Sequence, residues 1–259
     1  MIPINNLKLT KLKITLTFTK ATNLPIFIGN TIRGALGQSL YKNHHHTYNI
    51  LKVNTTESIP NPIVISAPYP SKGHYLPEET LTFYITLMGS ACDYAQSVTD
   101  ATQWMCKGKL ANTQLINCHE VYNLEWKDDG AQHIPTCEKL IINFITPTEI
   151  LINKQPPKEL DFTTFIDRLF LRLSGIIDNY TKSMFTIPYK LVYNKPHIQA
   201  ECDLQTVKLK TSSQPILGFI GQVRFYGDVT SYLPYIDLGS QIHIGKKTSR
   251  ACGEYSFKI

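Results

Sequence analysis

The chain has 259 residues, of which 42% are hydrophobic and 18% are charged, and its formal net charge is +6. This length is enough for one large domain or two small ones, and the composition is typical of a globular protein rather than a disordered segment. The six cysteines are scattered, with no Cys-x-x-Cys pair and no Cys/His ligand spacing, which argues against a zinc site and against a secreted disulfide scaffold.

The distribution of charge predicts the kind of partner better than the net charge does. The first 56 residues contain lysine and arginine but no acidic residue before Glu57, and the last region repeats this basic bias. Two basic segments that meet in space would attract an anionic partner such as a nucleic acid. The chain begins without the charged segment and apolar run of a signal peptide, and no aliphatic stretch is long enough to cross a bilayer. We therefore expect a cytoplasmic protein without a membrane segment.

Hydrophobic periodicity in the first half predicts the order strand, helix, strand, strand, helix, strand. Residues 12–18 alternate between apolar side chains and lysine or threonine, the pattern of a strand with one buried face. The first helix is expected over residues 28–41, with Asn30 or Thr31 as its N-cap. A polar loop that carries three adjacent histidines is expected after this helix. The remaining elements are strands at 62–69 and 81–88, a helix at 93–105 and a strand at 115–126.

The second half repeats this order after a turn-rich stretch at residues 127–135. Its most regular element is the helix at 161–180, for which Asp161 is a suitable cap. Strands are expected at 140–152, 205–211, 216–226 and 254–257, with a short helix at 229–237. The sequence therefore predicts an α+β protein of two tandem ferredoxin-like (β-α-β-β-α-β) domains, 1–135 and 136–259. RNA-recognition-motif (RRM) domains share this topology, although no strand here carries the aromatic residues with which they stack bases.

The stretch Leu238–Tyr255 combines glycines with cations and predicts a loop that contacts phosphate. Glycines such as Gly245 and Gly253 allow a close approach of the backbone, and their N–H groups beside cations suit phosphate oxygens. The cations are Lys246, Lys247 and Arg250. We expect a strand-turn-strand here, because the strand-GxxxxGK[ST]-helix order of a nucleoside-triphosphate loop is absent. The alternative is a basic, solvated hairpin.

Three segments resemble the CRISPR-associated endoribonuclease family that cleaves precursor CRISPR RNA within its repeats, part of the RAMP superfamily. They are the IRGALG sequence at 32–37, the central TP at 146–147 with LDF at 160–162, and the glycine-rich run from 218 to 255. The family usually has Gly-x-Gly before the final aromatic residue, whereas this chain has Ala251-Cys252-Gly253. The resemblance implies two ferredoxin-like domains, CRISPR repeat RNA as the partner, other Cas proteins as further partners, and no cofactor.

The resemblance also implies a chemistry, because members of this family cleave RNA without a metal ion. A 2′-hydroxyl attacks the adjacent phosphodiester, which requires a base, an acid and a cation for the developing charge. Histidine serves both proton roles because its ordinary pKa is near neutrality. The family's histidine follows the first helix, where this chain has His44, His45 and His46. We expect one of the three to act, with Tyr41 and Lys52 assisting.

The other site predictions concern contacts with RNA. Arg33 either faces the phosphates or pairs with a carboxylate, and His243 is expected on an alternating strand. The predicted RNA-binding residues are Arg33, Lys42, His243, Gly245, Lys246, Lys247, Arg250 and Gly253. No metal site is expected, since adjacent histidines chelate a single ion poorly. Two alternatives stay open: a non-catalytic RAMP subunit that binds RNA within an effector complex, and a ferredoxin-like protein-interaction module.

Overall fold

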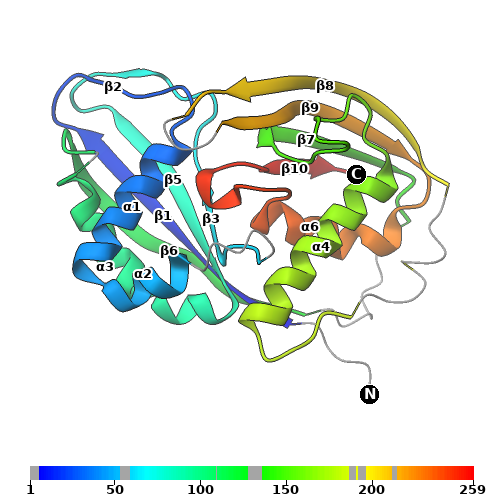
Figure 1. Cartoon of the computed structure of the whole chain (residues 1–259), viewed down its shortest axis with the longest axis horizontal. Coiled ribbons are helices and arrows are strands. Elements are labelled where there is room, and N and C mark those ends of the chain that lie inside the picture. The colour runs from blue at the N-terminus through cyan, green and yellow to red at the C-terminus, as the bar shows by residue number, and fades with distance from the viewer. Residues whose placement is uncertain are drawn as a thin grey trace. The chain divides into compact units, whose positions relative to one another are not determined.

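The computed structural model describes residues 6–52, 59–108, 110–127, 136–186, 191, 197–211 and 215–259, and the chain divides into two compact units (Figure 1). The first, which we call the N-terminal unit, comprises Leu7–Glu125 together with the short segment Ser249–Ala251. The C-terminal unit comprises Trp126–Thr248 and Cys252–Ile259, together with Asn6. The turn-rich stretch expected between the domains lies outside the described residues from position 128 to 135. No described helix is long and apolar enough to span a membrane.

The N-terminal unit folds in the order strand, two helices, two strands, helix, strand. Its main elements are β1 (Asn6–Phe18), α1 (Gly29–Asn43), α2 (His45–Lys52), β3 (Ile63–Ser66), β5 (Thr80–Met88), the 3₁₀ helix η1 (Gly89–Tyr94), α3 (Ala95–Met105) and β6 (Thr113–Lys127). The strands form a sheet in the order β3-β5-β1-β6, and β2 (Thr22–Asn23) pairs separately with β4 (His74–Tyr75). This is the strand order of a ferredoxin-like domain and confirms the predicted fold class.

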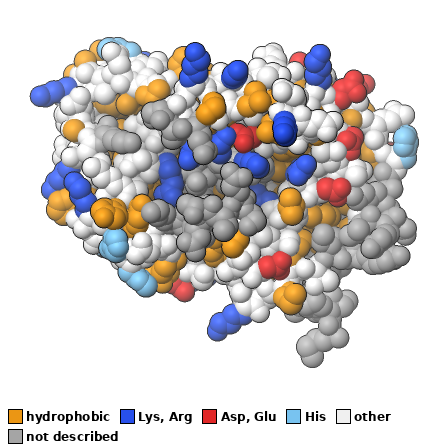
Figure 2. Space-filling model, viewed as in Figure 1, with side chains coloured by type: hydrophobic (Ala, Val, Ile, Leu, Met, Phe, Trp, Pro, Cys, Tyr) orange, Lys and Arg blue, Asp and Glu red, His pale blue; other side chains and the backbone are white. Residues whose placement is uncertain are grey.

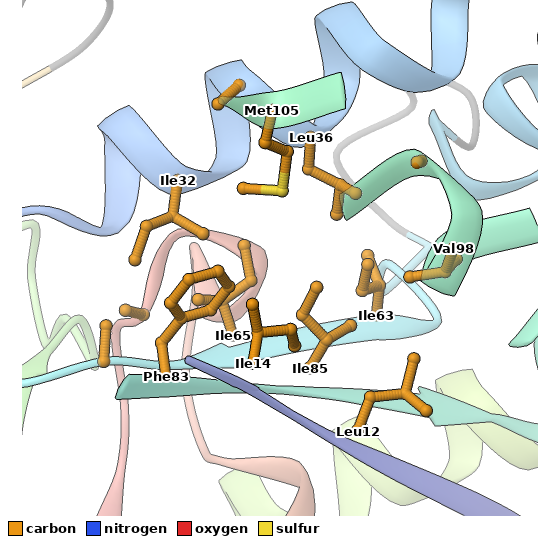
Figure 3. Close-up of a cluster of buried hydrophobic side chains, with 14 of the residues drawn as sticks. Leu12, Ile14, Ile32, Leu36, Ile63, Ile65, Phe83, Ile85, Val98 and Met105 are labelled. Atoms are coloured by element: carbon orange, nitrogen blue, oxygen red, sulfur yellow. The ribbon is translucent and has the colours of Figure 1, made fainter. Parts of the chain in front are cut away.

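The core of the N-terminal unit lies between the sheet and helices α1 and α3 (Figure 3). The alternation in β1 places Leu12 and Ile14 on the buried face, opposite Ile85 and Phe83 of β5. Helix α1 contributes apolar side chains at helical spacing, among them Ile32. Full burial of each such side chain stabilises the fold by about 1.5–3 kcal/mol. One stripe of α1 is therefore committed to the core, which leaves its other faces for other contacts.

The C-terminal unit repeats the same topology. Its elements are β7 (Lys139–Thr148), α4 (Phe162–Tyr180), β8 (Gln199–Leu209), β9 (Ile216–Tyr226), η2 (Thr230–Tyr232), α6 (Leu233–Ile242), η3 (Thr248–Arg250) and β10 (Tyr255–Lys258). The sheet order is β10-β7-β9-β8, again that of a ferredoxin-like domain. The ring of Phe144 in β7 lies 5.0 Å from that of Phe219 and 6.2 Å from that of Phe165 in α4, so aromatic packing joins the helix to the sheet.

Three predictions about local structure are wrong. Helix α1 begins after Ile28, and neither Asn30 nor Thr31 caps it; no side chain does. The polar loop expected after α1 is helix α2, which buries Thr47 and Leu51 although it is only eight residues long. The stretch that begins at Leu238 is not a strand-turn-strand, because α6 continues to Ile242. The alternating pattern wrongly predicted a strand here. Ile242 at the end of α6 and Ile244 in the loop after it are both buried, which gives the spacing of a strand.

We expect Asp161→Ala to lower the free energy of unfolding by about 1 kcal/mol at neutral pH. Asp161 caps α4, and its Oδ1 accepts a hydrogen bond from the backbone N–H of Thr164 at 2.8 Å. Urea denaturation measures the loss. Asp161→Asn is the matched control, since asparagine also caps helices and should lose much less.

This effect should depend on pH. Burial raises the pKa of Asp161, but the hydrogen bonds from Thr164 and the local backbone lower it by more, so the pKa lies below its ordinary value of 3.8. A carboxylate with a lowered pKa in the folded state stabilises the fold above its unfolded pKa, and this contribution disappears as the pH falls through the folded pKa. The difference in the free energy of unfolding between the wild-type protein and Asp161→Ala should therefore shrink only below about pH 4. A difference that shrinks at neutral pH would contradict the capping role.

Candidate functional site

One face of α1 carries Arg33, Gly37 and Tyr41, which are spaced one helical turn apart. A Cβ atom at Gly37 would lie 4.0 Å from Arg33 Nη1 and 4.0 Å from Tyr48 Cε2, so the guanidinium and the Tyr48 ring flank this glycine. Burial lowers the pKa of Arg33; Tyr48 raises it, and Arg250 lowers it further. Among the described residues Arg33 forms no ion pair with a carboxylate. The site thus holds a partly buried cation beside a second cation, which favours an anionic ligand.

His45 joins this face from the first turn of α2. Its ring lies 5.1 Å from that of Tyr41 and 6.2 Å from that of Tyr48, and the two tyrosine rings lie 5.2 Å apart. The His45 side chain is exposed to solvent. The structure therefore gathers an accessible imidazole, two phenols and the Arg33 guanidinium, which we call the α1–α2 face.

The other two histidines have different surroundings. His44 is the C-cap of α1, its N–H donates to Leu40 O at 2.8 Å, and its carbonyl oxygen accepts from Tyr48 N at 2.9 Å. His46 Nε2 lies 3.4 Å from the hydroxyl of Tyr94 in η1. The side chains of His45 and His46 therefore contact different tyrosines. Lys52 ends α2, and its side chain lies outside the described residues.

The glycine-rich segment adopts left-handed backbone conformations at several positions. The φ angles are +79° at Gly245 and +78° at Gly253, where a Cβ atom would lie 2.8 Å from Glu149 O and 1.8 Å from Ile244 O. Ala251 has a φ of +63°, so the position where the related family usually has glycine keeps a backbone that glycine favours. The chain forms a tight loop in spite of this substitution.

The predicted RNA-binding residues of this segment differ in how much they are exposed. Lys246 is exposed. Lys247 lies in a half-buried ion pair, with its Nζ 2.5 Å from Glu149 Oε2 and 2.9 Å from Pro215 O. His243 is 1% exposed, and its Nδ1 lies 3.0 Å from Cys252 O. Lys246 is thus the cation of this pair that faces solvent, while His243 and Lys247 hold the loop.

A buried arginine anchors the start of the same loop. Arg172 of α4 donates from its Nε to Ile242 O at 2.9 Å, which caps the end of α6 just before His243. Burial lowers the pKa of this guanidinium to about 9. Arg172 therefore positions the loop rather than presenting its charge to solvent.

Arg250 belongs to the N-terminal unit, because Ser249–Ala251 packs there. A Cβ atom at Gly29 would lie 2.0 Å from Arg250 O, so the first residue of α1 and this backbone are in direct contact. Residues distant in sequence thereby place Arg250 near Arg33. Figure 2 shows lysine, arginine and histidine side chains on the surface of the N-terminal unit, with few acidic ones among them. Within the described ranges no group of three or more histidine, cysteine or carboxylate side chains is arranged to hold a metal ion.

Two family models match the chain in succession. Residues 7–142 match AF_1859_N, described as an N-terminal domain, and residues 142–255 match the CRISPR-associated endoribonuclease Cas6. Residues 142–255 of the chain belong to the Cas6 family. The chain therefore belongs among the proteins that bind and process CRISPR RNA. No curated protein sequence matches the chain.

Solved Cas6 structures share the fold over almost the whole chain. Thermus thermophilus Cas6 (TTHB231) is 13% identical with a TM-score of 0.66, and the match covers 96% of this chain and 98% of that one. A substrate-mimic complex of Cas6 (TTHA0078) is 14% identical with a TM-score of 0.58, covering 97% and 99%. A partial Cas6-RT-Cas1–Cas2 complex is 13% identical with a TM-score of 0.67, covering 97% of this chain and 46% of that one. At these identities the likeness shows the fold alone.

Sequence reasoning missed Tyr48, Tyr94 and Trp104. The sequence predicts a loop at Tyr48, although its spacing of three from His45 is helical. Tyr94 approaches His46 from η1, a segment distant in sequence, and no local pattern could predict that contact. Trp104 looks like one apolar position of a weakly periodic helix, and only the structure shows that it is exposed.

We expect Gly29→Ala to destabilise the protein by about 1–3 kcal/mol, the usual cost of overpacking. The added methyl would collide with the backbone of Arg250, which cannot rotate away as a side chain can. Gly37→Ala is the control in the same helix, since nothing lies closer than 4.0 Å to its Cβ position. That change should stabilise α1 by about 0.5–1 kcal/mol, because alanine favours helix over glycine. Equal effects of the two substitutions in urea denaturation would refute the close contact.

Proposed function

We propose that this protein binds the CRISPR repeat and cleaves precursor CRISPR RNA by attack of a 2′-hydroxyl on the adjacent phosphodiester, without a metal ion. The 2′-oxygen forms a bond to phosphorus as its proton passes to a base. The bond to the 5′-oxygen breaks, and an acid protonates that leaving oxygen. The products are a 2′,3′-cyclic phosphate and a 5′-hydroxyl. Membership of an endoribonuclease family supports RNA cleavage as such.

The observation that carries this proposal is the grouping of His45, Arg33, Tyr41 and Tyr48 on the α1–α2 face. We assign proton transfer to His45, because its imidazole is exposed and lies on the same face as the guanidinium. Arg33 would stabilise the charge that develops on the phosphorane oxygens, since a partly desolvated cation acts more strongly than one in water. Tyr41 would orient the imidazole through its edge-on ring contact.

RNA would be held by the glycine-rich segment and by Arg250 near the start of α1. Exposed Lys246 supplies charge for phosphate oxygens, and the left-handed glycines let the backbone approach the RNA closely. Related Cas6 proteins occur in a product complex and in a Cas6-RT-Cas1–Cas2 complex, and a RAMP protein of similar fold binds different RNA substrates. We extend both to this chain as proposed partners: repeat RNA first, and other Cas proteins second.

We expect His45→Ala to lower the single-turnover rate of repeat-RNA cleavage by at least about 100-fold. RNA affinity should be retained, since the imidazole acts on a proton rather than on binding. The assay contains EDTA, and wild-type cleavage should be unaffected by it. His46→Ala is the matched control, because its imidazole contacts Tyr94 instead of the α1–α2 face.

Three outcomes would revise the proposal. Loss of cleavage in His46→Ala but not in His45→Ala would move the proton transfer to His46. Full cleavage by the variant with His44, His45 and His46 all changed to Ala would remove histidine from the mechanism. Wild-type protein that binds repeat RNA without shortening it would be a non-catalytic RNA-binding subunit.

We expect Lys246→Ala to weaken RNA binding and Lys247→Ala to lower the stability of the fold. Lys246→Ala should weaken RNA binding and reduce the slope of log affinity against log salt by about one, with stability unchanged. Lys247→Ala removes the ion pair with Glu149 and should lower the free energy of unfolding by about 2 kcal/mol. Filter binding over a range of NaCl concentrations and urea denaturation measure the two effects. An unchanged salt slope in Lys246→Ala would count against its phosphate contact.

A further inference from the structure

A surface hollow of about 240 Å³ lies between α1 and the end of α3, within the N-terminal unit. Its floor is apolar, because it is formed by Ala35 and Met105, which are 2% and 1% exposed. Trp104 forms part of the wall. We call this hollow the α1–α3 pocket. None of the residues proposed for proton transfer lines it, so the cleavage chemistry does not explain it.

Trp104 is the unusual member of this pocket. Its side chain is 43% exposed, although tryptophan is one of the most costly residues to leave in water. Its neighbour in space is Lys107, whose Nζ lies 3.8 Å from the centre of the ring. An exposed aromatic ring beside a lysine is the combination with which proteins hold single-stranded nucleic acid, through base stacking and phosphate contact.

The polar rim of the pocket adds groups that can read a base. Gln38 and Asn43 carry side-chain amides, and Gln38 Oε1 would lie 2.9 Å from a Cβ atom at Gly108. Asn43 Nδ2 donates to Ser39 O at 3.0 Å, which fixes the direction of its side chain. Amide side chains can donate and accept hydrogen bonds at one base edge, so they discriminate between bases.

The position of the pocket relates it to the α1–α2 face. Lys42 and Asn43 line the pocket and are the last two residues of α1, and His44 follows directly. Gln38 and Lys42 lie one turn apart on α1, next to the stripe of Gly37 and Tyr41. A nucleotide in the pocket would therefore neighbour the phosphate that the α1–α2 face is proposed to cleave.

We propose that the α1–α3 pocket binds one nucleobase of the RNA close to the scissile phosphate, stacked on Trp104 with its edge toward Gln38 and Asn43. Lys42 and Lys107 contact the phosphates on either side. This inference rests on the proposed function, since it assigns a specificity subsite to the same RNA. Lys107 leaves the ring when the base arrives, because stacking of a base on an aromatic ring is stronger than a cation–π contact at an exposed site.

The test is a double-mutant cycle between the protein and the RNA. Trp104→Leu keeps an apolar side chain but removes the stacking surface. Repeat RNAs carry one abasic nucleotide at each position around the cleavage site in turn. We expect Trp104→Leu to lower affinity for intact RNA about 10-fold. At one position the abasic substitution should weaken wild-type binding by a similar factor and leave binding by Trp104→Leu unchanged.

Leu171→Ala is the control, since Leu171 is an exposed apolar residue on α4 outside the pocket. It should show the same abasic penalties as wild type at every position. Identical penalties for wild type and Trp104→Leu at all positions would overturn the pocket. Failure of the wild-type protein to bind or cleave RNA would instead overturn the proposed function, so the two failures are distinguishable.

A fluorescence measurement decides the question if Trp104→Leu does not fold. The chain has two tryptophans, so in Trp126→Phe all tryptophan emission comes from Trp104. Repeat RNA should change this emission, and the RNA with the sensitive abasic position should not. Unchanged emission on binding of intact RNA would overturn the proposal. Equal changes caused by free nucleoside monophosphates at the RNA's concentration would also overturn it, since the pocket would then hold a free nucleotide.

Discussion

The backbone of Arg250 passes so close to the start of α1 that a Cβ atom at position 29 would lie 2.0 Å from its carbonyl oxygen. Only glycine fits there. This contact ties the final loop of the chain to its first helix, and it brings the charge of Arg250 close enough to lower the pKa of Arg33. The close approach of the two arginines near the α1–α2 face therefore depends on the absence of a side chain at Gly29.

Helix α1 organises the rest of the N-terminal unit because its three faces have separate roles. One stripe, which includes Ile32 and Leu36, is buried against the sheet. A second carries Arg33 and Tyr41 toward the α1–α2 face. A third carries Gln38 and Lys42 toward the α1–α3 pocket. A rigid helix fixes the angles between these faces. Packing of α1 against the core therefore keeps the proposed cleavage groups and base-binding groups at fixed positions relative to each other.

The fold could be predicted from the sequence wherever periodicity is strong. The alternation in β1 and the broad apolar stripe of α4 gave the correct elements, and their order predicted both ferredoxin-like units. Prediction failed where packing overrides local preference. Helix α2 is short and polar, so only burial of Leu51 reveals it, and the end of α6 is helical despite an alternating pattern.

The candidate site was predictable only in part, for a related reason. The histidine trio was visible in the sequence, but the feature that separates His45 from His46 is contact with Tyr41 and Tyr48 on one side and Tyr94 on the other. Lys246 and Lys247 are adjacent in sequence and look equivalent. Glu149, the residue after β7, distinguishes them because it forms an ion pair with Lys247.

The proximity of Arg33 and Arg250 has a consequence for the protein on its own. Two guanidinium groups repel each other, and burial deprives Arg33 of part of its hydration. A phosphate between them would relieve this repulsion, and so would dissolved salt, which screens like charges. Ionic strength therefore acts in two directions on this molecule. It relaxes the strain between the arginines when the protein is alone, and it weakens the hold on RNA once the complex has formed.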